Sequence, residues 1–177
     1  DIALTASGLL DPKVGGPSVY PPMPKSLLNL TFGGGGAWPE SEGGDRYRRG
    51  LYTYIKRTMP YPTTAVFDAP ARDMTCVRRV RSNTPLQALT LLNDASIMEA
   101  ARGAAARVCA EAGTDTAARI QHAFLLILSR PPDSQELAWV QSYFEQQRAR
   151  LGAEKEAEVW MLVCRALFNL DEAITKG

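Results

Sequence analysis

The chain has 177 residues, of which 45% are hydrophobic and 22% are charged, and its formal net charge is +1. This composition is typical of a globular chain and excludes disordered, collagen-like and membrane-spanning classes. The longest apolar runs, Ala123 to Leu128 and Val159 to Cys164, are far shorter than the roughly 20 residues of a membrane helix. The chain begins at Asp1 without a starting Met, so we expect it to be a piece of a longer protein.

The N-terminal part is rich in residues that interrupt regular structure. Ten of the 14 glycines lie at or before Gly50, and ten of the 12 prolines lie at or before Pro85. Glycine adds backbone freedom and proline removes a hydrogen-bond donor, so we expect ordered loop here, after a helix that ends near Leu10. The segments 51–55 and 63–67 have β propensity but are bounded by prolines, so either short strands or helical turns can form.

Two segments further along have the form of a capping box. Thr84 and Gln87 flank Pro85, and Asp133 and Glu136 have the same spacing. In this motif a side-chain oxygen accepts from a backbone N–H three residues on, while the later side chain reaches back. The two boxes therefore predict helices that begin near residues 85 and 134.

Apolar residues at helical spacing predict five helices after residue 83. Their expected limits are Pro85 to about Leu92, Asp94 to near Gly113, Thr114 or Asp115 to Ser129, Asp133 to Gly152, and about Glu154 to Ile174. The connections are short, which favours antiparallel neighbours. We therefore expect a mainly α fold: an antiparallel bundle of about four to five helices, with a loop-rich, Gly/Pro-rich N-terminal half packed on it. Residues 1–83 and 84–177 would form one domain of a larger protein.

Cysteine and histidine are scarce. Cys76, Cys109 and Cys164 form no C-x-x-C pair, which argues against a disulfide framework, a zinc site and a thioredoxin-like motif, and we expect buried thiols. Without C-x-x-C-H, no haem is covalently attached in this segment. His122 is the single histidine, and its place beside an apolar helical stripe is typical of a structural residue. We expect no metal and no cofactor in this chain.

Positive charge is concentrated in residues 45–81. This segment holds nine basic and three acidic residues, a net charge of +6, whereas residues 1–44 carry −2 and residues 82–177 carry −3. Arginine suits forked pairing with carboxylate, sulfate or phosphate, and tyrosines are interleaved with these arginines. The candidate binding residues are Arg46, Arg48, Arg49, Arg57, Asp68, Arg72, Arg78, Arg79 and Arg81.

Two interpretations of this basic segment remain open. In one it forms an exposed surface that binds anions or glycans; in the other the arginines satisfy internal carboxylates and backbone carbonyls. We expect exposure for Arg46, Arg48 and Arg49, which follow a glycine-rich stretch, and scaffolding for Arg78 and Arg79. Nucleic acid is not an expected partner, because the chain as a whole is near neutral.

The run from Asp45 to Asp94, which contains TPLQALTLLND, resembles a known family. GGPSVYPP upstream and RIQHAFLLILSRPPDSQEL and CRALFNLDEAI downstream fit the same family, the planctomycete-specific C-terminal domain of unknown function (DUF 1553). Relatives often have an aromatic residue where Ile55 stands and a Cys one place before Cys76, so we assign Cys76 no metal or redox role.

The resemblance implies a setting rather than an activity. Complete proteins of this kind carry a signal peptide, often a planctomycete cytochrome c domain, and a second domain upstream. It therefore implies export to the periplasm or the extracellular space, contact with upstream domains of the same polypeptide, and haem only in an upstream domain. Neighbouring genes tend to encode sulfatases and polysaccharide-degrading enzymes.

We expect a non-catalytic structural or binding module whose candidate ligand is an anionic, sulfated glycan. The alternative is that the chain supplies part of a hydrolase or redox active site shared with an upstream domain. In that case Asp45 and Asp68 would be the paired carboxylates, and their separation in space would decide the matter.

Overall fold

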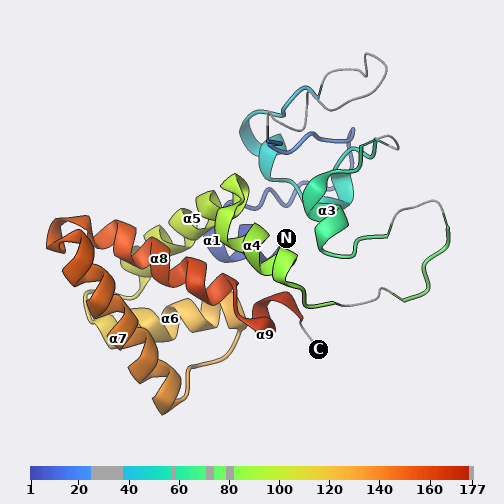
Figure 1. Cartoon of the computed structure of the whole chain (residues 1–177). Coiled ribbons are helices and arrows are strands. Elements are labelled where there is room, and N and C mark those ends of the chain that lie inside the picture. The colour runs from blue at the N-terminus through green and yellow to red at the C-terminus, as the bar shows by residue number, and fades with distance from the viewer. Residues whose placement is uncertain (25–37, 57–58, 71–73, 79–81, 176–177) are drawn as a thin grey trace. The chain divides into compact units, whose positions relative to one another are not determined.

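The computed structural model describes residues 1–24, 38–56, 59–70, 74–78 and 82–175 (Figure 1). The fold is mainly α, as the sequence predicts, and the described residues contain no strand. They divide into two compact units: unit 1 comprises Asp1 and residues 10–90, and unit 2 comprises residues 2–9 and 91–177. None of the described helices is long and apolar enough to cross a membrane.

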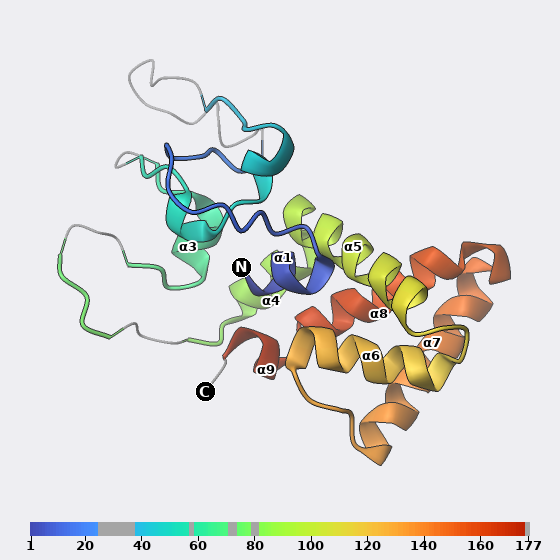
Figure 2. The ribbon, with the colours of Figure 1, turned by 180° about the vertical axis from the view of Figure 1, so that it is seen from behind.

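Unit 2 is a helical bundle. Its long helices α5, α6, α7 and α8 pack on one another, and α5 and α8 make the most extensive pairing. Figure 2 shows that consecutive helices reverse direction, so that α8 runs opposite to α5. The elements of this unit are α1 (Ile2–Ser7), α5 (Ala95–Glu111), α6 (Thr116–Leu128), α7 (Ser134–Leu151), η3 (Ala153–Lys155), α8 (Glu156–Phe168) and α9 (Asp171–Ile174).

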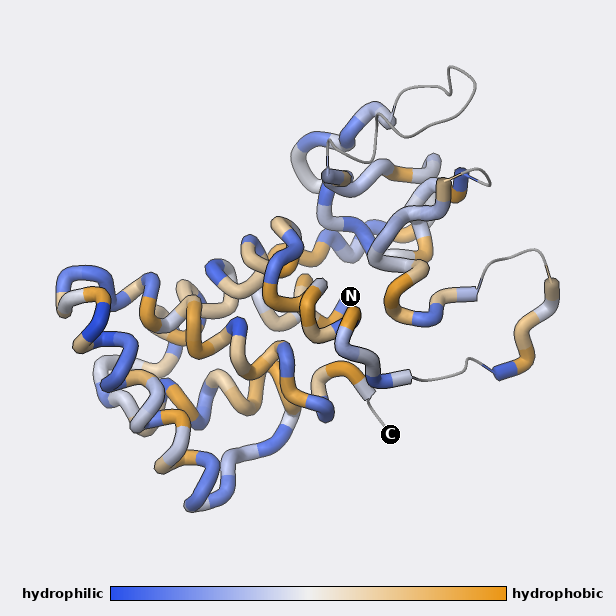
Figure 3. Tube along the Cα trace, in the orientation of Figure 1, coloured by the Kyte–Doolittle hydropathy of each residue, from blue (hydrophilic) through white to orange (hydrophobic). Residues whose placement is uncertain are grey.

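Aromatic side chains fill the centre of this bundle. Trp160, Phe124 and Phe144 are at most 2% exposed, and the rings of Phe144 and Trp160 lie 4.7 Å apart between centroids. Around them the inner faces of the helices are apolar, and Figure 3 shows the alternation of hydrophobic and hydrophilic positions along each helix. A core of this kind needs neither a metal nor a disulfide to hold it together.

The long helices of unit 2 begin close to the predicted limits, and aspartates cap three of them. Asp94, Asp115 and Asp133 each accept backbone N–H groups from the first turn of the helix that follows. The capping box at Asp133 is complete: the carboxylate accepts from the Glu136 N–H at 2.7 Å, and the Glu136 carboxylate accepts from the Asp133 N–H at 2.8 Å. Helix α7 ends at Gly152, also as predicted.

The last predicted helix is interrupted, which corrects the sequence interpretation. The N–H groups of Asn169 and Leu170 bond to carbonyls three residues earlier, and Leu170 has an extended backbone with ψ of 147°. The chain therefore leaves α8 at Phe168 and starts the separate α9 at Asp171. The apolar spacing continues across this break, so periodicity does not reveal it.

The short α1 packs on α5 through small residues. Ala100 and Ala104 of α5 are at most 1% exposed, and Ala6 of α1 is 2% exposed. A Cβ atom placed on Gly103 would lie 2.9 Å from the Ser7 Cβ and 3.1 Å from the Ser7 carbonyl oxygen. The close approach of the two helices therefore requires glycine at position 103, and residues 2–9 belong with the C-terminal bundle rather than with the N-terminal segment assigned from sequence.

Unit 1 consists of loops tied together by short helical turns. These are η1 (Gly43–Tyr47), η2 (Gly50–Tyr52), α3 (Pro62–Val66) and the first residues of α4 (Pro85–Asn93). Of the two segments for which strands or turns remained open, 63–67 lies almost wholly in the helical turn α3, whereas 51–55 begins in η2 and becomes extended at Thr53. Two isolated bridges, Asp11 with Arg48 and Val19 with Thr53, join the loops.

Unit 1 has a small aromatic core of its own. The ring planes of Trp38 and Tyr61 stack at 5.9 Å with an interplanar angle of 6°, and Met23 packs beside them. The polar atoms of both rings are used: Trp38 Nε1 donates to the Pro21 carbonyl at 2.8 Å, and the Tyr61 hydroxyl donates to the Pro22 carbonyl at 3.0 Å. The aromatics therefore fix the loops by stacking and by hydrogen bonding.

Candidate functional site

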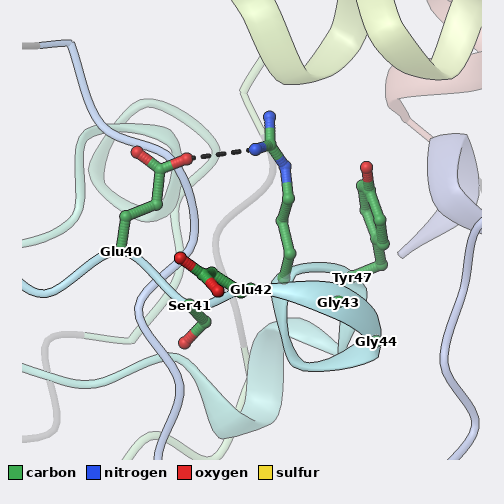
Figure 4. Close-up of a pocket in the computed structure, with 7 residues that line it drawn as sticks. Glu40, Ser41, Glu42, Gly43, Gly44 and Tyr47 are labelled. Carbon is green, nitrogen blue, oxygen red and sulfur yellow. Dashed lines mark hydrogen bonds and ion pairs between the residues drawn. The ribbon is translucent and has the colours of Figure 1, made fainter.

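A shallow hollow of about 500 Å³ lies at the start of the basic segment (Figure 4). It is lined by Glu40, Ser41, Glu42, Gly43, Gly44, Arg46 and Tyr47. Arg46 Nη1 lies 3.2 Å from Glu40 Oε1, the ion pair marked by the dashed line in Figure 4. Two carboxylates and one guanidinium give the lining a net negative charge, so this hollow is a poor match for an anionic ligand.

Arg48 is buried, which corrects the expectation that it is exposed. Only 3% of the residue is exposed, and its guanidinium lies 3.8 Å from the centre of the Tyr52 ring. It donates to three backbone carbonyls, those of Lys13 at 3.1 Å, Gly15 at 2.5 Å and Pro17 at 3.3 Å. Arg48 therefore organises the 13–17 loop, the scaffolding role that the sequence left open.

Arg49 lies at the surface and pairs locally. Its side chain is 55% exposed, and Nε lies 3.5 Å from Asp1 Oδ2, while the Gly50 N–H donates to Asp1 Oδ1 at 2.7 Å. An exposed pair at this distance contributes little to stability, because both charges stay hydrated.

Arg78 is exposed, although the sequence favoured scaffolding for it. The described segment around it, residues 74–78, is exposed throughout: Met74 is 80% and Val77 97% accessible. No hydrogen bond or ion pair joins the Arg78 guanidinium to another residue that the structure describes. The remaining candidates, Arg57, Arg72, Arg79 and Arg81, lie outside the described residues and stay predictions.

Asp68 precedes this exposed segment in the chain and is held by hydrogen bonds. Its φ of 53° is in the left-handed region, which Asp tolerates better than most residues. Its Oδ2 atom accepts from the Ser82 hydroxyl at 2.6 Å, from the Ser82 N–H at 3.1 Å and from Gln87 Nε2 at 3.4 Å. These contacts tie the end of α3 to the residues that precede α4.

Gln87 is the centre of this cluster. The sequence predicted its role in the capping box but not its contacts with the other residues of the cluster. It is 1% exposed, and its Nε2 also donates to the Val66 carbonyl at 2.9 Å and to the Ser82 hydroxyl at 3.0 Å. Its Oε1 accepts from the Thr84 N–H at 3.1 Å, which completes the predicted capping box. The box was the one sequence signal for this residue; the contacts with 66, 68 and 82 need the folded chain.

The sequence also matches a known family, described as "Protein of unknown function (DUF1553)", over residues 1–144. The chain belongs to this family. No curated protein and no solved structure matches it. The description of the DUF1553 family assigns no activity.

The two carboxylates that the hydrolase alternative requires have separate partners in this DUF1553 chain. Asp45 Oδ1 lies 3.9 Å from Lys13 Nζ, whereas Asp68 contacts Ser82 and Gln87. Among the described residues no contact joins the two aspartates. The same part of the chain holds no group of three or more His, Cys, Asp or Glu side chains that could bind a metal ion.

The histidine and the cysteines have structural surroundings in the DUF1553 chain. His122 Nε2 lies 2.8 Å from Glu111 Oε2, and hydrogen bonds from Arg107 and then from His122 lower the pKa of that carboxyl. Cys164 is buried, as expected, and burial raises the pKa of its thiol to about 12, so it stays protonated at neutral pH. Cys109 is half-buried and Cys76 is exposed, so the expectation of buried thiols is confirmed for Cys164 and is wrong for Cys76.

Proposed function

We propose that this DUF1553 chain is a non-catalytic binding module that recognises anionic, sulfated glycans. The observation that supports it is Arg78, whose side chain lies in an exposed segment and has no partner among the described residues. A guanidinium presents several N–H donors in one plane and pairs with two sulfate oxygens at once.

The distribution of partners among the described arginines supports a surface near Arg78. Arg48 donates its hydrogen bonds to backbone carbonyls. Arg46 pairs with Glu40, and Arg49 pairs with Asp1. Arg78, by contrast, stands at the start of the sequence Arg78-Arg79-Val80-Arg81, which places three positive charges within four positions. We therefore assign the ligand to the region of Arg78 rather than to the acidic hollow beside Arg46.

The test is a titration of the chain with a sulfated polysaccharide and with the same polymer after desulfation. We expect binding of the sulfated form only, with an affinity that falls as salt rises through the physiological range, because exposed charges are screened over about 8–10 Å. The Arg78→Ala/Arg79→Ala double variant should bind about tenfold more weakly, which corresponds to about 1.4 kcal/mol.

The matched control is Arg102→Ala, which removes one exposed guanidinium from α5. It should bind like the wild type and should keep the same melting temperature. If the chain does not bind at low salt, or if the double variant loses its fold rather than its affinity, the scaffolding interpretation replaces the proposal. Equal binding of sulfated and desulfated polymer would exclude anion recognition.

We further propose that the module works within an exported protein, joined to upstream domains. Membership of the DUF1553 family supports this part of the proposal, because the resemblance implies export and upstream domains. Fractionation of cells that express the natural full-length protein tests its location. A cytoplasmic full-length protein would contradict this part of the proposal.

A further inference from the structure

Asp68 and Ser82 enclose the segment that carries Arg78. They are separated by 14 positions in the sequence, yet the Ser82 hydroxyl donates to Asp68 Oδ2 at 2.6 Å. The 13 residues between them include Arg72, Arg78, Arg79 and Arg81. The two ends of the segment are therefore fastened together at one point.

We infer that Asp68, Ser82 and Gln87 form a clasp that joins the end of α3 to the start of α4, and that this clasp helps to position Arg78, which lies between them in the chain, for ligand binding. The positioning role rests on the proposed function, whereas the clasp itself does not. The three residues are positioning residues, because they act on the ligand through Arg78.

Three features make the clasp rigid. Asp68 Oδ2 accepts both the hydroxyl and the backbone N–H of Ser82, so the side chain and the main chain are held together. Gln87 Nε2 contacts Asp68, Ser82 and the Val66 carbonyl from a position that is 1% exposed. Gln87 itself is fixed to helix α4 by the capping box with Thr84. Hydrogen bonds to a charged acceptor in a part-buried site are stronger than those made in water.

The clasp has a direct consequence for binding. In general, a chain segment whose two ends are not joined can adopt many conformations, and fixing one of them upon binding opposes association. Joining the ends at Asp68 and Ser82 removes part of that freedom before the ligand arrives. The exposure of residues 74–78 then leaves Arg78 accessible while the base of the segment stays fixed.

The first arm of the test measures the clasp without any ligand. Amide hydrogen exchange, followed by NMR in the full chain, reports the N–H groups of residues 82, 84 and 87, which the cluster uses as donors. We expect Ser82→Ala to lower their protection about tenfold, since one hydrogen bond to a charged group is lost. Ser82→Thr keeps a hydroxyl and should restore the protection.

Ser142→Ala is the control, because it makes the same chemical change at an exposed position of α7. It should leave the protection at 82, 84 and 87 unchanged. Unchanged protection in Ser82→Ala as well would overturn the clasp.

The second arm measures affinity for the sulfated polysaccharide. Ser82→Ala should weaken binding about fivefold with unchanged helical signal, and Ser82→Thr should recover it. If Ser82→Ala loses protection but binds like the wild type, the positioning role is wrong and the cluster is only structural. If the wild type itself does not bind, the proposed function fails, while the exchange measurement still decides whether the clasp exists.

Discussion

Arg48 and Arg78 belong to one basic segment, yet their side chains have opposite surroundings. Arg48 is enclosed by a loop whose Gly15 and Gly16 have φ of 79° and 89°, values that glycine adopts easily. This backbone turns carbonyl groups onto the two Nη atoms of the guanidinium, and hydrogen bonds of this kind lower the cost of burying a charge. Arg78 lies beside Val77, which is 97% exposed, and no such loop surrounds it in the described residues.

At the same scale, Thr84 sets the start of α4. Its Oγ1 accepts from the Gln87 N–H at 3.3 Å, and its own N–H donates to Gln87 Oε1. Thr84→Ala removes the acceptor and should lower the free energy of unfolding by about 0.5–2 kcal/mol, measured by urea unfolding followed by circular dichroism. Thr84→Ser keeps the acceptor and should stay close to the wild type. An unfolding midpoint unaffected by Thr84→Ala would show that the cap contributes nothing.

At the scale of elements, one arginine joins three helices of unit 2. Arg130 follows α6 and contacts Glu136 of α7 through two bonds of 2.6 and 2.7 Å, and Glu172 of α9 through two bonds of 2.7 Å. These forked pairs hold α9 against the turn between α6 and α7. They give α9 an anchor of its own, which does not depend on α8.

The network predicts a pH dependence. The hydrogen bonds from Arg130, followed by the Asp133 N–H, lower the pKa of Glu136 from 4.5 to about 2, and Arg130 lowers the pKa of Glu172 as well. As the pH falls below about 4.5 the unfolded chain takes up protons before the folded chain does. The stabilising contribution is therefore complete above about pH 4.5 and is lost as the pH falls through about 2.

The variant Arg130→Gln tests this dependence. It should unfold more easily than the wild type at neutral pH, and the difference in unfolding free energy should shrink steadily between about pH 4.5 and about pH 2. Arg102→Gln, at an exposed site on α5, should show no such trend. A difference between Arg130→Gln and the wild type that stays constant with pH would contradict the assignment.

At the scale of the whole molecule, the chain order does not follow the division into units. Residues 2–9 pack in unit 2, whereas Asp1 and residues 10–90 form unit 1. Arg107 of α5 supports this arrangement, because its Nη1 donates to the carbonyls of Thr5 at 3.3 Å and Ala6 at 2.9 Å. The helical bundle therefore uses the start of the chain as one of its elements.

Removal of residues 1–9 should destabilise the bundle. The truncation exposes the alanine face of α5 and removes two backbone acceptors of Arg107. Because each buried methyl-sized group contributes about 0.8 kcal/mol, we expect the free energy of unfolding to fall by about 2 kcal/mol or more. Thermal unfolding of the bundle measures it.

Gly103→Ala provides the matched test, because its expected effect on stability has opposite signs in the full chain and in the chain that lacks residues 1–9. In the full chain the new methyl group would meet Ser7, so the variant should be less stable. In the truncated chain the same change should stabilise α5 by about 0.5–1 kcal/mol, since Ala favours a helix over Gly. The same sign in both chains would contradict the packing of α1 on α5.

The sequence by itself determined the helices of unit 2, their caps and the capping box at Thr84, because these depend on hydrogen bonds and apolar spacing within about four residues. It also carried the family resemblance. The sequence did not predict the break before α9, because the apolar spacing continues through Leu170. The residue that anchors α9, Arg130, is 42 positions away from its partner Glu172.

Only the tertiary structure decided which arginines are buried, where α1 packs and how Asp68 meets Ser82 and Gln87. Arg48 finds its acceptors 31 to 35 positions away, and Arg107 contacts α1 across more than 100 positions. An arginine in a loop can satisfy its donors with carbonyls, carboxylates or water at similar cost, so its local sequence does not select among them. The choice follows from which distant segments the aromatic and alanine-rich contacts bring within hydrogen-bonding reach.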